Sequence, residues 1–415
     1  MSLKVGILSL GCPRNLVDSE SILGRLHLKG YDIVDIDKAD VAIVNTCVFI
    51  DDAKRESIDA ILDLIQAKKE GRLKKIIVQG CLSQRYKDEL IKELPEVDAF
   101  VGKLFLDSDL GRFAITPKYF AYLKICEGCI NTCSYCVIPK IKGKFVSLDE
   151  TAIIRKVEKF DKEDISELNI IGQDITGFGI DLYGRTDLSS LLKKIVKCAK
   201  HIGWFRLLYL YPSRVDENLL KIIKDEPRVC KYIDLPVQHI NDRILKLMNR
   251  GTTKKAIIAL IDKIRKTIPD VAIRSSVITG FPTETEKEFR ELLDFIREIK
   301  FERLGAFVYS REEGTKAYGM KGQLLNKIKQ ERFNEVMLLQ QDISKEVNRK
   351  FLGKRLEVLI DSKEGTSYLG RTQYDAPEVD GQVYINSNKV LRPGDFVKAV
   401  ITDTMEYDLV GEVKS

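Results

Sequence analysis

The sequence lacks a long hydrophobic run, contains only three histidines and one tryptophan, and has little net charge. A membrane helix needs roughly 18 to 20 consecutive apolar residues, and no segment of the chain approaches that length. The first ten residues have the pattern of a β-strand rather than that of a signal peptide. We therefore expect a soluble, cytoplasmic protein with no membrane partner. The three histidines are too dispersed along the chain to form a metal site.

Neither sign of charge dominates, because 68 Lys and Arg against 62 Asp and Glu leave a net charge of +6. Over 415 residues this excess is too small to indicate, by itself, a nucleic-acid-binding protein. Apolar residues make up 44% of the chain, which is enough to give each of about three domains of roughly 150 residues its own core. A disordered or collagen-like chain is excluded.

Three successive patterns predict three domains and an α/β fold class. Residues 1–117 alternate short β-branched runs with amphipathic helices, which predicts a small parallel α/β domain. Residues 118–350 repeat a strand and a helix about six times and end in a long helix over 324–351, which predicts a partial (β/α)6 barrel. Residues 351–415 alternate short strands with turns, which predicts a small antiparallel β-barrel or sandwich.

The same patterns place individual elements. In the first domain, a helix is expected at 51–69 and strands at 5–10, 41–45 and 76–79. The strands of the second domain are expected at 120–125, 168–171, 204–210, 232–235, 271–278 and 303–309. One helix of this domain has a capping box at its start, Thr283 with Glu286. It leads into apolar residues at helical spacing: Phe289, Leu292, Leu293, Phe295 and Ile296.

The nine cysteines are the most informative residues of the chain. An odd number of cysteines in a long chain without a secretion signal argues against a disulfide framework and favours thiolates that hold a metal. Two are expected to be structural: Cys198 on a helix face and Cys230 near a strand start. The other seven fall into an early scattered group and a later compact group.

Each early cysteine follows the carboxyl end of a predicted strand. Cys12, Cys47 and Cys81 are spaced 35 and 34 residues apart, about one βαβ unit each, so three neighbouring parallel strands would bring their thiols to one sheet edge. Open α/β sheets bind their ligands at that edge. Three converging thiolates suit an iron-sulfur cluster that keeps one iron without a protein ligand. The alternative is that all three are buried core thiols.

The later group has C-x3-C-x2-C spacing and follows the first strand of the second domain. Cys129, Cys133 and Cys136 offer three thiolates, which would leave the fourth iron of a cubane open to a substrate or cofactor. In the alternative, Cys126 completes a closed four-thiolate site for zinc or an electron-transfer cluster. The three-residue gap is shorter than the separation that zinc-ribbon pairs use, and Cys126 lies inside the strand, where a core role fits better.

This segment resembles the radical S-adenosylmethionine superfamily. The resemblance depends on the cysteine spacing, on the aromatic Tyr135 before the last cysteine and on the position after the first strand of a six-fold barrel. It implies that Cys129, Cys133 and Cys136 hold a 4Fe-4S cluster whose fourth iron chelates the amino and carboxylate groups of S-adenosylmethionine. An electron from a separate one-electron donor would then cleave the sulfonium and give a 5′-deoxyadenosyl radical, which is chemistry that the cofactor supplies.

Over essentially its whole length the chain resembles the methylthiotransferases of that superfamily. The three early cysteines and a TRAM-like terminal β-barrel support this, and SLGCPRN at 9–15 and RTQYDAPE at 371–378 resemble the branch that modifies a ribosomal protein. The resemblance implies two 4Fe-4S clusters, the second on Cys12, Cys47 and Cys81, with S-adenosylmethionine as the methyl and radical source. The implied partner is decoding-centre protein number twelve of the small ribosomal subunit, free or on the ribosome, methylthiolated at the β-carbon of an aspartate.

Two other functions stay open. One is the tRNA-modifying branch of the family, which acts on an adenosine, and the other is a zinc-dependent RNA-binding protein that requires Cys126. Residues 354–415 carry eight Lys and Arg and eleven Asp and Glu, a net charge of −3, which leaves +9 on the remainder. A barrel that grips RNA should be basic, whereas an acidic one suits a basic ribosomal protein. Transfer RNA is therefore the less expected partner.

Residues at the carboxyl ends of the predicted barrel strands are candidates for binding S-adenosylmethionine. Gln173, Gln238 and Thr279 lie at such ends, although each could instead serve a turn, and Tyr135 lies beside the cluster cysteines. His239 is a candidate general base, but a structural bond at a helix start fits it better. No catalytic residue is predicted beyond the cluster ligands.

Two further expectations concern the surroundings of the site. The family usually has arginines after the third cluster cysteine, whereas this chain has lysines between Lys140 and Lys144. This change keeps the charge and loses the bidentate fork of arginine, and we expect a solvated basic loop there. Because a substrate must reach both clusters, the first domain and the mouth of the barrel are expected to face each other.

Overall fold

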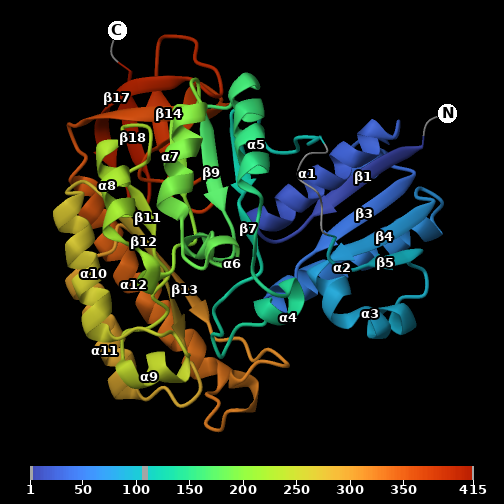
Figure 1. The fold of residues 1–415 in the computed structure, drawn as a ribbon, viewed down its shortest axis with the longest axis horizontal. Helices are drawn as coiled ribbons and strands as arrows, with labels where there is room; N and C mark the ends of the chain where they lie inside the picture. The colour runs from blue at the N-terminus through green and yellow to red at the C-terminus, as the bar shows by residue number, and fades with distance from the viewer. Residues whose placement is uncertain (1–2, 105–110, 414–415) are drawn as a thin grey trace.

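The computed structural model describes residues 3–104 and 111–413 and has three parts (Figure 1). A parallel sheet with helices forms the first part, six parallel strands with surrounding helices form the second, and a closed β-barrel ends the chain. The predicted α/β class with a terminal β-barrel is confirmed. The domain limits at 117/118 and 350/351 stay a prediction. Residues 1, 2, 105–110, 414 and 415, which the predicted limits include, lie outside the described residues.

The first part is a five-stranded sheet in the order β2-β1-β3-β4-β5, in which every neighbouring pair is parallel. Every residue of β3 is buried, as expected of an inner strand of a parallel sheet. The predicted strands and the helix at 51–69 are confirmed. The elements are β1 (Lys4–Ser9), α1 (Pro13–Leu28), β2 (Asp32–Ile33), β3 (Val41–Thr46), α2 (Asp51–Lys69), β4 (Lys75–Gly80), α3 (Cys81–Glu93) and β5 (Ala99–Val101).

The second part contains the six predicted strands, arranged as two three-stranded parallel sheets, β10-β9-β6 and β11-β12-β13. β10 is shorter than predicted and ends at Leu207, because Tyr209 adopts a positive φ of 67° that a strand cannot continue. The strands are β6 (Phe120–Lys124), β9 (Glu167–Ile171), β10 (Trp204–Leu207), β11 (Tyr232–Asp234), β12 (Ala272–Thr279) and β13 (Arg303–Val308). Their main covering helices are α5 (Glu150–Lys162), α7 (Leu188–Cys198), α8 (Glu217–Asp225), α10 (Lys254–Thr267), α11 (Glu286–Ile299) and α12 (Asn326–Arg349).

The capping box of helix α11 differs from the predicted one. Thr285 is the N-cap residue and forms the box with Glu288, two residues later than predicted. Thr283 has a φ of +68° in the preceding turn, so it cannot serve as an extended N-cap, and the Glu286 carboxylate pairs with arginines instead. The predicted apolar face of the helix is confirmed, since all five of its residues are buried.

The terminal barrel closes in the order β14-β15-β16-β18-β17. The expectation of a fully antiparallel barrel is wrong at one pair, because β16 and β18 are parallel. Strand direction cannot alternate all the way round a closed ring of five strands. The elements are β14 (Arg355–Glu364), β15 (Ser367–Thr372), β16 (Val383–Asn386), β17 (Phe396–Thr404) and β18 (Leu409–Glu412). Within the described ranges, no helix is long and apolar enough to cross a membrane.

The terminal barrel packs on the amino ends of the middle strands. Arg371 pairs with Glu167, the first residue of β9, at 2.7 Å, and Asp375 pairs with Arg303, the first residue of β13, at 2.5 Å. These four side chains are buried. Residues 371–378 therefore take part in an ionic contact between the terminal barrel and the second part of the chain. This contact lies at the amino ends of the middle strands, opposite to the end that carries the cysteine loop.

Candidate active site

The three early cysteines come together at the carboxyl edge of the first sheet. Cys12 is the N-cap of α1, Cys47 follows β3, and Cys81 opens α3 directly after β4. Strands β1, β3 and β4 are neighbours in the sheet, so their ends deliver these thiols to one place. The predicted convergence is therefore present in the structure, while the role of the thiols as ligands stays a prediction.

Two buried asparagines that the sequence analysis did not single out fix this edge. Asn15 donates to the carbonyl oxygens of Leu10 at 3.1 Å and Thr46 at 3.0 Å. Asn45 donates to the carbonyl of Asn15 at 2.7 Å and to Ser19 Oγ at 2.8 Å. The amides thereby tie α1 to the end of β3, which holds the backbone beside Cys12 and Cys47. Asn15 lies within the 9–15 segment, whereas no sequence signal distinguished Asn45.

Replacing Gly80 by alanine is expected to disturb this edge. Gly80 has a φ of +99°, and a Cβ there would lie 2.5 Å from Asn45 Oδ1 and 2.8 Å from the Thr46 carbonyl oxygen. Gly71→Ala is the matched control, because its φ is +76° and nothing lies within 4 Å. We expect Gly80→Ala to lower the free energy of unfolding by about 2 kcal/mol more than Gly71→Ala does. Urea unfolding measures both losses. Equal losses of unfolding free energy in the two variants would show that the close approach of Gly80 to Asn45 and Thr46 does not affect stability.

Charge and burial act differently on the three early thiols. Burial alone would raise the pKa of Cys12, but the Arg14 guanidinium outweighs it and the pKa lies below its usual value. Burial raises the pKa of Cys47, and it raises the pKa of Cys81 to about 12 although Lys142 acts in the opposite direction. A thiol held in such a site ionises when a metal replaces its proton.

The later cysteines lie in the loop between β7 (Cys126–Glu127) and α4 (Ile138–Lys142). Asn131 Nδ2 donates to Cys129 Sγ at 3.4 Å, and Arg250 Nη1 donates to Cys133 Sγ at 3.6 Å. Burial raises the pKa of Cys129, and that of Cys136 to about 12. The structure thus gives this loop fixed hydrogen-bond donors aimed at sulfur.

Cys126 faces the core, apart from the loop. Its side chain is fully buried, and its thiol donates to the carbonyl oxygen of Asp174 at 3.7 Å. This geometry matches the expected core role.

In the part of the chain that the structure describes, no three His, Cys, Asp or Glu side chains converge on a single metal ion. A cubane differs from such a site because it places each thiolate on a different iron.

A polar network that the sequence analysis missed ties the cysteine loop to the barrel. Asn131 Nδ2 donates to Asp174 Oδ2 at 2.6 Å, and Arg214 donates both to Asn131 Oδ1 at 2.7 Å and to the same Asp174 carboxylate. Asp174 lies at the end of β9, one of the strand ends that were singled out. Arg214 ends a short 3-10 helix, Pro212–Arg214, and no sequence pattern pointed to it.

The four candidate contacts to S-adenosylmethionine lie in different surroundings. Gln173 donates to Glu127 Oε1 at 3.4 Å, and its buried Oε1 has no hydrogen-bond partner among the described residues. Gln238 donates to Ser276 Oγ at 3.5 Å. The hydroxyl of Thr279 bonds to the backbone of α12 and β13, so the structure supports this residue least.

Tyr135, the fourth candidate, packs beside Ile244, Met248 and Phe281 in an apolar cluster. Burial raises its pKa well above the usual value, although Arg250 acts against this. The side chain therefore remains a neutral phenol within an apolar wall next to the cysteine loop. All four roles in binding S-adenosylmethionine stay predictions.

His239 has the structural role that we favoured. Its Nδ1 accepts a hydrogen bond from the Asn241 backbone N–H at 3.0 Å, so its Nε2 carries the proton and donates to Glu284 Oε1 at 3.1 Å. Both ring nitrogens are used, and the imidazole is fully buried.

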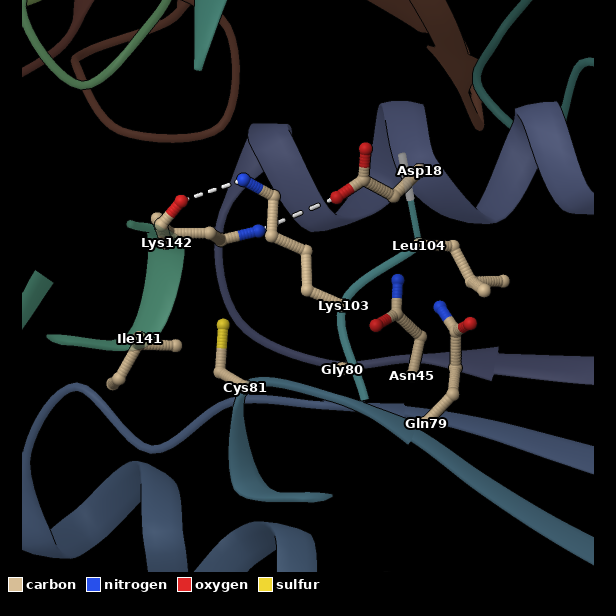
Figure 2. A pocket seen from close by; sticks show the side chains of 9 residues that line it. All are labelled: Asp18, Asn45, Gln79, Gly80, Cys81, Lys103, Leu104, Ile141 and Lys142. Atoms are coloured by element: carbon tan, nitrogen blue, oxygen red, sulfur yellow. Dashed lines mark hydrogen bonds and ion pairs between the residues drawn. The ribbon is translucent and has the colours of Figure 1, made fainter. Parts of the chain in front are cut away.

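The expectation of a solvated basic loop is wrong for Lys142. This side chain is buried, and its Nζ lies 3.4 Å from Asp18 Oδ2 and 3.5 Å from Glu127 Oε1. Figure 2 shows Lys142 and Lys103 beside Cys81, where all three line one small cavity. The volume of this cavity is about 10 Å³. Lys142 is buried because of a contact between two domains. Helix α4 brings Lys142 to the domain boundary, where the carboxylate of Asp18, in the first domain, balances its positive charge.

Contacts across this boundary make the first domain face the barrel mouth, as expected. Arg14 Nη1 donates to the carbonyl oxygen of Gly172, just after β9, at 2.9 Å. Further along the boundary, Arg85 pairs with Glu312 at 2.8 Å, and both side chains are nearly buried. The two cysteine groups consequently lie on facing surfaces of the two domains.

Comparisons with known proteins agree with this arrangement. Residues 4–102 match the model of the Uncharacterized protein family UPF0004, residues 123–296 that of the Radical SAM superfamily and residues 352–413 that of the TRAM domain. The radical S-adenosylmethionine methyltransferase TsrM from Kitasatospora setae has the same fold over 88% of this chain and 82% of its own. Its TM-score is 0.54 and its sequence identity 13%.

The fold and the cysteine loop therefore define a radical S-adenosylmethionine enzyme, a class that uses a 4Fe-4S cluster and S-adenosylmethionine. The chain is 47% identical to the ribosomal protein uS12 methylthiotransferase RimO of Thermoanaerobacter sp. (strain X514), over 98% of this chain and 99% of that relative. It is 46% identical to RimO of Clostridioides difficile (strain 630), over 99% of both. The chain belongs to the RimO family of radical S-adenosylmethionine methylthiotransferases.

Proposed function

We propose that this chain adds a methylthio group to the β-carbon of an aspartate in ribosomal protein uS12. The observation that supports this most strongly is the 47% identity to a uS12 methylthiotransferase over nearly the whole of both chains. The similarity extends through the thiol-bearing sheet, the barrel and the terminal domain. It therefore includes the parts that we assign to sulfur transfer and to substrate docking.

We assign one 4Fe-4S cluster to each cysteine group. Each group has a fixed cation at a thiol: Arg250 Nη1 at Cys133, and Arg14 Nε at Cys12 at 3.4 Å. Positive charge and hydrogen bonds at sulfur stabilise a thiolate-held cluster. The proposed ligands are Cys129, Cys133 and Cys136 for the cluster that binds S-adenosylmethionine, and Cys12, Cys47 and Cys81 for the auxiliary cluster.

The bound cofactors would supply the radical chemistry that an unactivated carbon–hydrogen bond requires. The protein residues bind and orient. Gln173 Oε1, which is buried and without a partner in the described part of the chain, is available to accept from the amino group of S-adenosylmethionine. Tyr135 and its apolar neighbours exclude water beside the cysteine loop. Asn131 and Asp174 hold that loop against β9.

The test is a choice between two substrates. Reconstituted enzyme with dithionite and S-adenosylmethionine receives equimolar uS12 and unmodified tRNA, and both are analysed by mass spectrometry. We expect one methylthio group on the uS12 aspartate and unchanged tRNA, with uS12 carrying asparagine at that position as the unreactive control. A modified adenosine with unmodified uS12 would assign the chain to tRNA instead. Modification of neither would contradict the proposed activity.

The acidic terminal barrel is expected to contribute to docking and not to the chemistry. It packs at the amino ends of the barrel strands, far from the cysteine loop, and Glu364, Asp403 and Glu412 are exposed on it. Replacing all three by lysine should raise KM for uS12 several-fold and leave kcat unchanged, because charge complementarity acts mainly on association. Initial-rate kinetics measure KM and kcat for this variant and for a control. The control reverses three exposed charges on α2 instead: Glu56→Lys, Asp59→Lys and Asp63→Lys. Equal effects in both variants would contradict a docking role.

A further inference from the structure

Arg14 contacts both domains at the candidate site. Its Nε lies 3.4 Å from Cys12 Sγ, and its Nη1 donates to the carbonyl oxygen of Gly172 at 2.9 Å. Gly172 follows β9 and precedes Gln173. One guanidinium therefore links the thiol edge of the first sheet to the carboxyl end of a barrel strand.

Tyr209 holds this guanidinium from the barrel side. The Arg14 guanidinium carbon lies 4.5 Å from the centre of the Tyr209 ring. Tyr209 has a φ of +67°, a backbone conformation that aromatic residues rarely adopt. Its N–H donates to Asp234 Oδ2 at 2.8 Å, and its carbonyl accepts from the Ile175 N–H at 3.2 Å. A strained residue that its neighbours hold in place is typical of functional sites.

The charge of Arg14 lies at the early cysteine group, because its guanidinium contacts the Cys12 sulfur directly. Arg14 is half-buried, and charges interact more strongly away from bulk water.

We propose that Arg14 is a positioning residue that holds the two cysteine groups facing each other and stabilises negative charge at the auxiliary cluster. This inference rests on the proposed function, because it needs a cluster at each group. Reduction adds an electron to a cluster, so a fixed cation nearby favours the reduced form and raises the midpoint potential. Loss of the Arg14 charge should therefore lower the midpoint potential of the auxiliary cluster.

The test measures each cluster separately. One reconstituted background carries Cys12→Ala, Cys47→Ala and Cys81→Ala, and the other carries Cys129→Ala, Cys133→Ala and Cys136→Ala. Arg14→Gln is placed in each, and the midpoint potential is titrated by electron paramagnetic resonance without S-adenosylmethionine. We expect a negative shift in the second background, which keeps Cys12, Cys47 and Cys81, because Arg14 contacts Cys12 directly. The shift in the first background should be smaller. Arg14→Lys, which keeps the charge, should restore most of the potential of the auxiliary cluster.

Two comparison variants make the result specific. Arg250→Gln removes a charge that contacts the sulfur of Cys133, in the later group, and should shift only the cluster of that group. Arg72→Gln removes an exposed charge far from both groups and should shift neither. No shift in the second background, or a shift no larger than in the first, overturns the role of Arg14 while both cysteine assignments stand. If the second background binds no iron, the assignment of Cys12, Cys47 and Cys81 fails, and the inference fails with it.

Discussion

A variant with Cys12, Cys47 and Cys81 all replaced by alanine is expected to cleave S-adenosylmethionine and yet form no methylthiolated uS12. Cleavage needs only the cysteine loop after β7, which the substitutions leave intact. Sulfur transfer needs the auxiliary cluster that we assign to the three substituted thiols. Chromatography of 5′-deoxyadenosine and mass spectrometry of uS12 in one reaction measure the two outcomes together.

The complementary variants decide how this result is interpreted. Replacing Cys129, Cys133 and Cys136 by alanine should abolish both cleavage and product. Cys198→Ala is the matched control, because Cys198 lies at the end of α7 and donates only to the Ile195 carbonyl, and it should retain both activities. Methylthiolated product from the first variant would show that the early cysteines hold no cluster needed for transfer.

Glu167→Gln is expected to cause the largest loss of stability. The Glu167 carboxylate is fully buried and lies 2.7 Å from both Arg206 and Arg371. Glutamine has nearly the same shape, but it leaves the buried Arg206 guanidinium without a carboxylate partner among the described residues. Arg371 then keeps only its pair with Asp361. Breaking a buried pair in this way costs about 3–5 kcal/mol. Urea unfolding measures this loss, and Glu163→Gln, at an exposed pair with Lys159, should cost almost nothing.

The loss caused by Glu167→Gln should depend on pH. Burial raises the pKa of Glu167, but Arg371 and Arg206 outweigh it and hold the pKa below its usual value. A carboxylate with a depressed folded-state pKa stabilises the fold above its unfolded pKa of roughly 4.3, and this contribution is lost as pH falls through the folded pKa. The parent and the variant should therefore converge in stability as the pH drops below about 4. A constant difference would contradict the ionic explanation.

Much of the site could be predicted because it depends on local periodicity. Strand ends recur at βαβ spacing, and parallel neighbours share an edge, so Cys12, Cys47 and Cys81 were expected at one place, and they lie there. The C-x3-C-x2-C loop likewise follows its strand directly. These features need no knowledge of contacts between distant segments.

The features that the sequence analysis missed depend on tertiary contacts or on choices between equivalent patterns. Thr283 with Glu286 and Thr285 with Glu288 both match a capping box, and only the turn before α11, with its positive φ, distinguishes them. Lys142 looked solvated because its partner Asp18 lies 124 residues away in sequence. The parallel pair in the terminal barrel follows from closing five strands into a ring, which local alternation does not show.

The most direct measurement of the central claim is the content of iron, acid-labile sulfide and zinc per chain after anaerobic reconstitution of the parent protein. Two cubanes, one on each cysteine group, predict about eight iron and about eight sulfide per chain with no zinc. About four iron would leave only one cluster and contradict the two-cluster account. Zinc with little iron would contradict it entirely.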